Sequence, residues 1–127
     1  MQALLLIFLG AGLGGCLRYG VTIGVGRFLA TPFPWGILIV NVTGSLVMGL
    51  VAGWLAFKSE PGWAQPVRLF VATGVLGGYT TFSTFSLDAV LLWERGEWIP
   101  ALGYVLGSVV ISILALAAGL AIVRNLA

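Results

Sequence analysis

The sequence predicts an all-α membrane protein with four transmembrane helices, the third of them broken near its centre. Of the 127 residues, 60% are apolar and 8% are charged, whereas a soluble domain carries about a quarter charged residues. The mean hydropathy is +1.11, so the polar groups are too few to cover the apolar surface in water. Short polar or proline-containing turns divide the chain into four apolar segments, each with the ~20 residues that cross a bilayer.

The first two helices are expected over residues 2–29 and 36–57. Residues 31–35, TPFPW, separate them, because two prolines disfavour the continuation of a helix. The first segment lacks the basic start of a signal peptide and its apolar pattern continues past Gly15, so we expect it to be retained. The second segment carries no charged residue.

The third and fourth helices are expected over residues 67–93 and 99–123. Residues 58–66, KSEPGWAQP, should form a polar turn before the third helix, since they combine charges with proline and glycine. Residues 94–98, ERGEW, should form the next loop. The four helices are predicted to make a single transmembrane domain that spans the whole chain, 1–127.

The residue types exclude several kinds of chemistry. The chain has no histidine and a single cysteine, Cys16. This removes histidine-based catalysis, Cys/His metal sites and an intrachain disulfide. We also expect that the protein is not an enzyme and does not bind nucleic acid.

The positive charges are nearly balanced between the two sides of the membrane. With four helices both termini lie on one side, and the bias in lysine and arginine sets the orientation. One side is expected to hold Lys58, Arg68 and Arg124. The other side is expected to hold Arg27, Arg95 and, at its edge, Arg18. Insertion in both orientations is favoured, and two opposite copies could then pair about a two-fold axis in the membrane plane; a small bias that fixes one orientation is the alternative.

Residues 77–86, GGYTTFSTFS, place glycines and hydroxyls in the middle of the third apolar segment. Gly77 and Gly78 tolerate unusual dihedral angles and are expected to unwind the helix there. Broken backbone at membrane depth survives only when it is buried in protein or lines a cavity. Its freed carbonyls are potential cation ligands, and the hydroxyls that follow can satisfy the backbone or donate to an anion.

Phe82 and Phe85 share one face of the helix after this break, because they are three residues apart. A phenyl ring has a positive edge, so two edges aimed at one point could hold a small anion and exclude water. Packing against lipid or protein is the alternative, and for two phenylalanines alone it is the favoured one.

Polar side chains also stand at membrane depth in the second and fourth segments. The Asn41 amide cannot be fully satisfied within its own helix, so it should face another helix or a pore. Tyr104, Ser108 and Ser112 follow one another at intervals of four residues and form one polar stripe. The stripe indicates either a polar track or a helix contact.

Arg18 lies about sixteen residues into the first segment, which is roughly 24 Å along a helix and near the far edge of the hydrocarbon. It either extends its charge into the headgroups or places a positive charge at the mouth of a water-filled vestibule, where it would attract anions. The residues alone leave both interpretations open.

Three stretches of the chain occur together in a specific order. They are GGCLRYG at 14–20, WGILIVNVTGSLVMG at 35–49 and GVLGGYTTFSTFSLD at 74–88. In order and spacing they resemble the Fluc (CrcB) family of fluoride channels, and the resemblance covers the whole chain.

The resemblance implies an antiparallel, dual-topology homodimer in the inner membrane, with two fluoride pores that each use both subunits. Such a channel would let fluoride leave the cell passively and so limit its accumulation in the cytoplasm. The pore residues that it implies are Asn41, Thr81, Phe82, Ser83, Thr84, Phe85, Tyr104, Ser108 and Ser112. It also implies a position in the vestibule for Arg18.

The same resemblance implies a structural sodium ion at the centre of the dimer, held by the backbone carbonyls of Gly77 and Thr80 from both subunits. Two residues depart from the family pattern. Ile37 stands where the family often has threonine, which puts a vestibule role for that hydroxyl in doubt. Cys16 stands where alanine is common, which is expected to be neutral for packing.

The competing interpretation is a small dual-topology exporter of drugs or other cations. Such a protein would need a buried glutamate in its first helix to bind a cation, and the first segment has none. A structural membrane subunit without transport is a third interpretation, and the cluster of phenylalanine, serine and threonine argues against it.

Overall fold

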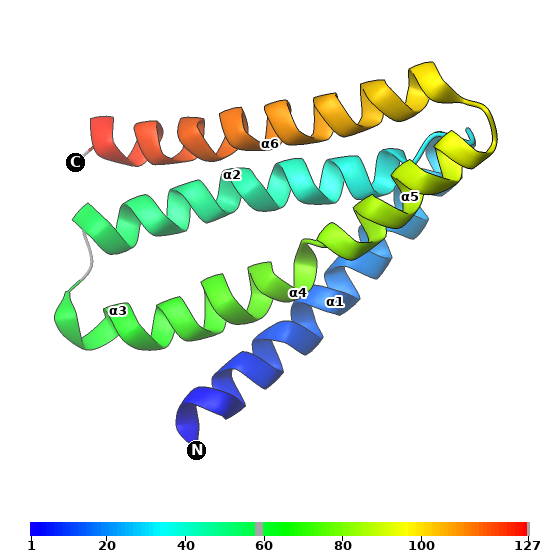
Figure 1. Cartoon of the computed structure of the whole chain (residues 1–127). Helices are drawn as coiled ribbons and strands as arrows, with labels where there is room; N and C mark the ends of the chain where they lie inside the picture. The colour runs from blue at the N-terminus through cyan, green and yellow to red at the C-terminus, as the bar shows by residue number, and fades with distance from the viewer. Residues whose placement is uncertain (58–59, 127) are drawn as a thin grey trace.

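The structure, a computed structural model, describes residues 1–57 and 60–126, and the regular elements in that part are all helical. Four stretches are long and apolar enough to cross a membrane: Gln2–Phe28, Trp35–Phe57, Gly62–Glu94 and Trp98–Asn125. The prediction of four candidate membrane helices is therefore confirmed. Figure 1 shows helix α2 (Trp35–Phe57) and helix α6 (Trp98–Asn125) side by side, running in the same direction. Lys58, which entered the charge count, lies outside the described residues.

The third span is built from several helical pieces. It comprises α3 (Pro61–Val67), the π-helix η1 (Arg68–Leu76), α4 (Gly77–Tyr79) and α5 (Phe82–Glu94). The chain changes direction between α4 and α5, so the predicted bend in the third helix is confirmed (Figure 1). The helix begins at Pro61, so the prediction of a polar turn up to residue 66 is wrong in that part. Proline suits the first position of a helix, because its fixed φ is already helical and that position needs no N–H partner.

The break lies three residues after the position that the glycines suggest. Gly77 is helical, with φ −63° and ψ −37°. The extended residues are Thr80 (φ −78°, ψ 159°) and Thr81 (φ −154°, ψ 117°). The prediction that Gly77 and Gly78 unwind the helix through unusual dihedral angles is therefore wrong. Among the described residues, the one glycine with positive φ is Gly96, at 77°.

Gly78 serves close packing against helix α1 (Gln2–Phe28). A Cβ at Gly78 would overlap the Ala11 carbonyl, and one at Gly14 would overlap the Val75 carbonyl. A Cβ at Gly77 would meet only Ala72, at 3.9 Å. The absence of a side chain thus lets α1 and the third span approach backbone to backbone, as small residues do in membrane helices.

Helices α2 and α6 are joined in the same way over their second halves. A Cβ at Gly49 would overlap the Leu116 carbonyl, and one at Gly119 would overlap the Leu46 carbonyl. At the other end of this pair, Phe85, Leu92 and Tyr104 form a buried cluster with Ile37 and Ala101. Ile37 is 6% exposed there, an environment that suits its apolar side chain.

Candidate functional site

The Asn41 side chain holds the break from helix α2. Its Nδ2 donates to the Thr81 carbonyl at 3.1 Å, and the Thr81 N–H donates to Asn41 Oδ1 at 2.9 Å. The amide thus satisfies both backbone groups of Thr81, which have left the helical pattern. Asn41 does face another helix, as its polarity predicts, and its contact lies where the third span breaks.

Arg18 contacts the same break from helix α1. Its Nη1 donates to the Thr80 carbonyl at 3.3 Å. The Thr80 N–H and hydroxyl both donate to the Leu76 carbonyl, at 3.0 and 2.9 Å. Side chains from α1 and α2 therefore satisfy backbone groups that the break exposes, as broken backbone at membrane depth requires.

The hydroxyls after the break start helix α5. Thr81 is its N-cap, and Thr81 Oγ1 accepts from the Thr84 N–H at 3.2 Å. The same oxygen donates to Thr84 Oγ1 at 3.0 Å and lies 3.3 Å from Ser83 Oγ. Capping of this kind satisfies backbone donors that a helix start leaves free. Much of the hydroxyl cluster is therefore engaged in beginning a helix at membrane depth.

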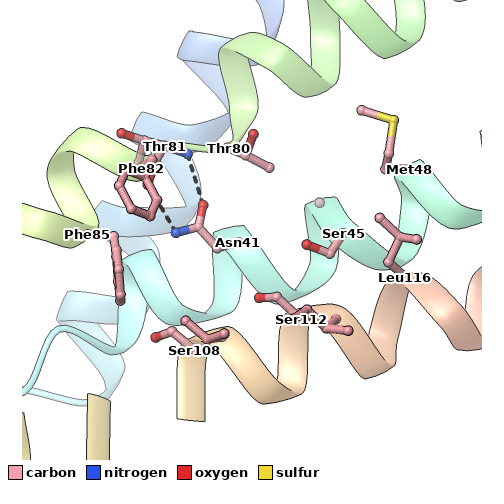
Figure 2. Close-up of a pocket in the computed structure, with 13 residues that line it drawn as sticks. Asn41, Ser45, Met48, Thr80, Thr81, Phe82, Phe85, Ser108, Ser112 and Leu116 are labelled. Atoms are coloured by element: carbon pink, nitrogen blue, oxygen red, sulfur yellow. Dashed lines mark hydrogen bonds between the residues drawn. The ribbon is translucent and has the colours of Figure 1, made fainter. Parts of the chain in front are cut away.

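A cavity of about 320 Å³ lies between the break and helices α2 and α6. Figure 2 shows that α2 and α6 form one side of it and the residues around the break form the other. Its polar lining residues are Asn41, Ser45, Thr80, Thr81, Ser108 and Ser112. Of the predicted pore residues in the described part of the chain, Ser83, Thr84 and Tyr104 do not line it.

Phe82 and Phe85 both border this cavity, with ring centroids 5.5 Å apart and planes inclined at 45°. Their surroundings differ, because Phe85 is 8% exposed and Phe82 is 78% exposed. Phe85 also packs against Tyr104, at a centroid distance of 5.2 Å. Phe85 is therefore both a wall of the cavity and part of the buried cluster, whereas Phe82 projects from the surface of the protomer.

The serines of the polar stripe have hydroxyls that lack a partner. Ser108 Oγ and Ser112 Oγ are buried without a hydrogen bond. A serine in a membrane helix commonly bonds back to a carbonyl of its own helix, as Thr43 does to Ile39 at 2.7 Å. The two serine hydroxyls instead stay available as donors beside the cavity.

Tyr104, the first member of the stripe, uses its hydroxyl elsewhere. It is fully buried and donates to Asp88 Oδ2 at 3.3 Å. Asp88 was not among the predicted site residues. A carboxylate within an apolar segment was the signal that could have drawn attention to it, since such groups need a partner in the membrane.

The cavity combines neutral donors with apolar walls. Its donors include the hydroxyls of Ser108 and Ser112 and the second Nδ2 proton of Asn41, because the first is bonded to Thr81. Among the described residues that line the cavity, none is charged. Such a site suits a small anion that exchanges its water for protein donors.

A four-helix membrane protein with a broken helix beside a polar cavity has the construction of a channel or transporter. The family model described as CrcB-like protein, Camphor Resistance (CrcB), matches residues 5–120. The chain is 57% identical to Fluoride-specific ion channel FluC 2 of Nitrobacter hamburgensis, over 96% of this chain and 97% of that protein. It is 58% identical to Fluoride-specific ion channel FluC of Rhodopseudomonas palustris, over 94% of this chain and 95% of that protein.

The chain belongs to the CrcB-like family, as its three quoted stretches indicate. With its four apolar helices it is a multi-pass protein of a bacterial inner membrane. The comparisons do not favour the small multidrug exporter.

Proposed function

We propose that this chain forms a channel that conducts fluoride passively out of the cell. The observation that carries this proposal is the pair of buried, unpartnered hydroxyls of Ser108 and Ser112 beside the Asn41 amide. Fluoride is small and strongly hydrated, so it enters a membrane only where donors replace its water. Relatives named fluoride-specific ion channels, at more than half identity over nearly the whole chain, support this choice of ion.

Neutral lining also supports a channel rather than a coupled pump. Conduction requires binding that is weak enough to release the ion, and a fixed positive charge in the cavity would oppose release. Asp88 lies in the third span but is paired with Tyr104, and it does not line the cavity.

The aromatic walls contribute their positive ring edges, and we assign this role to Phe82 and Phe85. In this proposal Arg18 attracts fluoride toward the break, while Thr81 and its hydroxyl partners Ser83 and Thr84 hold the start of α5 beside the ion path.

The functional unit in this proposal is an antiparallel homodimer with two pores. Phe82 borders the cavity and is nevertheless 78% exposed, so one copy leaves this wall uncovered. A second copy in the opposite orientation would cover Phe82 and complete each pore. The balanced positive charges are compatible with insertion in both orientations.

A structural sodium ion at the dimer centre is part of the same proposal, and the break fits such an ion. The Thr81 N–H, the usual helical partner of the Gly77 carbonyl, donates to Asn41 instead. The Thr80 carbonyl accepts one bond from Arg18 and has a second lone pair. The carbonyls of Gly77 and Thr80 from both subunits would hold the sodium ion. The ion would offset the partial negative charge of these oxygens and link the broken third spans of the two subunits.

Fluoride efflux from liposomes tests the proposed function. Purified protein is reconstituted with internal potassium fluoride or potassium chloride, and efflux starts when valinomycin is added. We expect rapid fluoride efflux and chloride efflux no faster than from protein-free liposomes. Equal efflux of the two anions, or no fluoride efflux from a folded protein, would refute a fluoride channel.

A further inference from the structure

The polar side chains that line the cavity from helices α2 and α6 end at the same level of the cavity. In α6 the hydroxyls of Ser108 and Ser112 are followed, four residues later, by Leu116. In α2 Ser45 is followed on the same face by Met48. Met48 and Leu116 both line the cavity, and Figure 2 shows them together at the end away from Phe85.

The two helices close on each other just past this level. The backbone of Gly49 lies against that of Leu116, and the backbone of Gly119 lies against that of Leu46. The following residues of α2 (49–57) and α6 (117–123) carry no hydroxyl, carboxamide or charged side chain. Between α2 and α6, Met48 and Leu116 therefore mark the end of the polar lining.

We propose that Met48 is an apolar gate at this end of the cavity, a role that rests on the proposed fluoride conduction. Leu116 is the fixed opposite wall, because its backbone is packed against Gly49. Met48 is the adaptable wall, since a methionine side chain is unbranched and has three rotatable bonds. Its sulfur offers fluoride no donor, so a hydrophobic constriction forms where the ion has just left the serine hydroxyls.

Replacing the methionine by a small hydroxyl residue tests the gate. Met48→Ser should raise fluoride efflux by roughly three- to tenfold, because the constriction widens and gains a donor. Met48→Leu keeps the apolar bulk and should stay within about twofold of the unmodified protein. Val47→Ser is the matched control, since Val47 is 40% exposed and does not line the cavity. Unchanged efflux in a folded Met48→Ser protein, or an equal rise in Val47→Ser, would overturn the proposal.

A second measurement does not depend on a faster rate. Met48→Cys is made in a Cys16→Ala background and treated with a negatively charged methanethiosulfonate reagent. We expect the thiol to be modified from water and the modification to block fluoride efflux, while Val47→Cys in the same background keeps its efflux. Failure of the reagent to modify Met48→Cys, or modification without loss of efflux, would refute a gate at this position.

The untreated wild-type protein separates this inference from the proposed function. Absence of fluoride efflux from the wild-type protein would overturn both. Normal wild-type efflux with no effect at Met48 would overturn the gate alone.

Discussion

Asn41 carries out two tasks with one amide. It bonds both backbone groups of Thr81, and it lines the cavity beside Ser108 and Ser112. An asparagine at membrane depth is expected to face either another helix or a pore, and polarity alone does not say which. Asn41 does both, because one Nδ2 proton is bonded to the Thr81 backbone and the other is free beside the cavity.

Asn41→Ala should destabilise the folded protein. It leaves the buried N–H and carbonyl of Thr81 without partners, and each unsatisfied group costs about 1–3 kcal/mol. The midpoint of thermal unfolding in detergent measures this loss. Ser45→Ala is the control, since Ser45 also lines the cavity from α2, whereas the Thr81 backbone is bonded by Asn41. Equal midpoints for Asn41→Ala and the wild-type protein would show that the amide does not hold the break.

Phe82 gives the cleaner test of ring edges. Phe85 packs against Tyr104 in the buried cluster, so its replacement also disturbs the core. Phe82→Ile keeps an apolar side chain at a site that is 78% exposed in the protomer, but it removes the ring quadrupole. We expect a folded protein that elutes as the wild type does and conducts fluoride much more slowly. Near-normal efflux through that variant would show that the ring only packs.

The helices illustrate what hydropathy can and cannot locate. Four apolar segments between polar turns predicted the four candidate spans, because the bilayer sets helix length. The break was placed at Gly77 from glycine's conformational freedom, but it lies at Thr80 and Thr81. Its position depends on contacts from Arg18 and Asn41, which are 62 and 40 residues away in sequence from their partners. Local sequence carries no information about such contacts.

The hydroxyl cluster was only partly interpretable for the same reason. An N-cap threonine is a local feature, and Thr81 has that role before α5. The pairing of Tyr104 with Asp88 and the unpartnered state of Ser108 both depend on how α5 and α6 pack. The stripe of hydroxyls could thus be predicted from spacing, while the use of each hydroxyl could not.

Of the two glycines at 77 and 78, we expect Gly78 to be the one that close packing against α1 requires. Gly78→Ala places a Cβ against the Ala11 carbonyl of α1 and should lower the unfolding midpoint. Gly12→Ala is the matched control, because a Cβ there meets nothing within 4 Å. That control should be neutral or stabilising by up to about 1 kcal/mol through helix propensity. A Gly78→Ala protein as stable as Gly12→Ala would contradict the close approach of α1 and the third span.

Two copies in opposite orientations are the proposed whole assembly, and topology labelling tests it. Gly62→Cys in a Cys16→Ala background marks the start of the third span, where a Cβ meets nothing within 4 Å. A membrane-impermeant thiol reagent should label about half of the protein from each face, because the Lys/Arg bias is nearly absent. Glu94→Cys, at the other end of that span, should behave alike. Labelling from a single face would exclude the antiparallel dimer.

The central claim is that unpartnered hydroxyls and an amide replace the water of fluoride. The most direct measurement is fluoride efflux through the Ser108→Ala/Ser112→Ala variant, with its unfolding midpoint recorded on the same preparation. Because neither serine hydroxyl has a partner, their removal breaks no internal hydrogen bond, and the midpoint should be unchanged or higher. We predict a stable protein whose fluoride efflux falls by roughly tenfold or more, which corresponds to about 1.4 kcal/mol of lost stabilisation along the path. Wild-type fluoride efflux through this stable double variant would contradict the account.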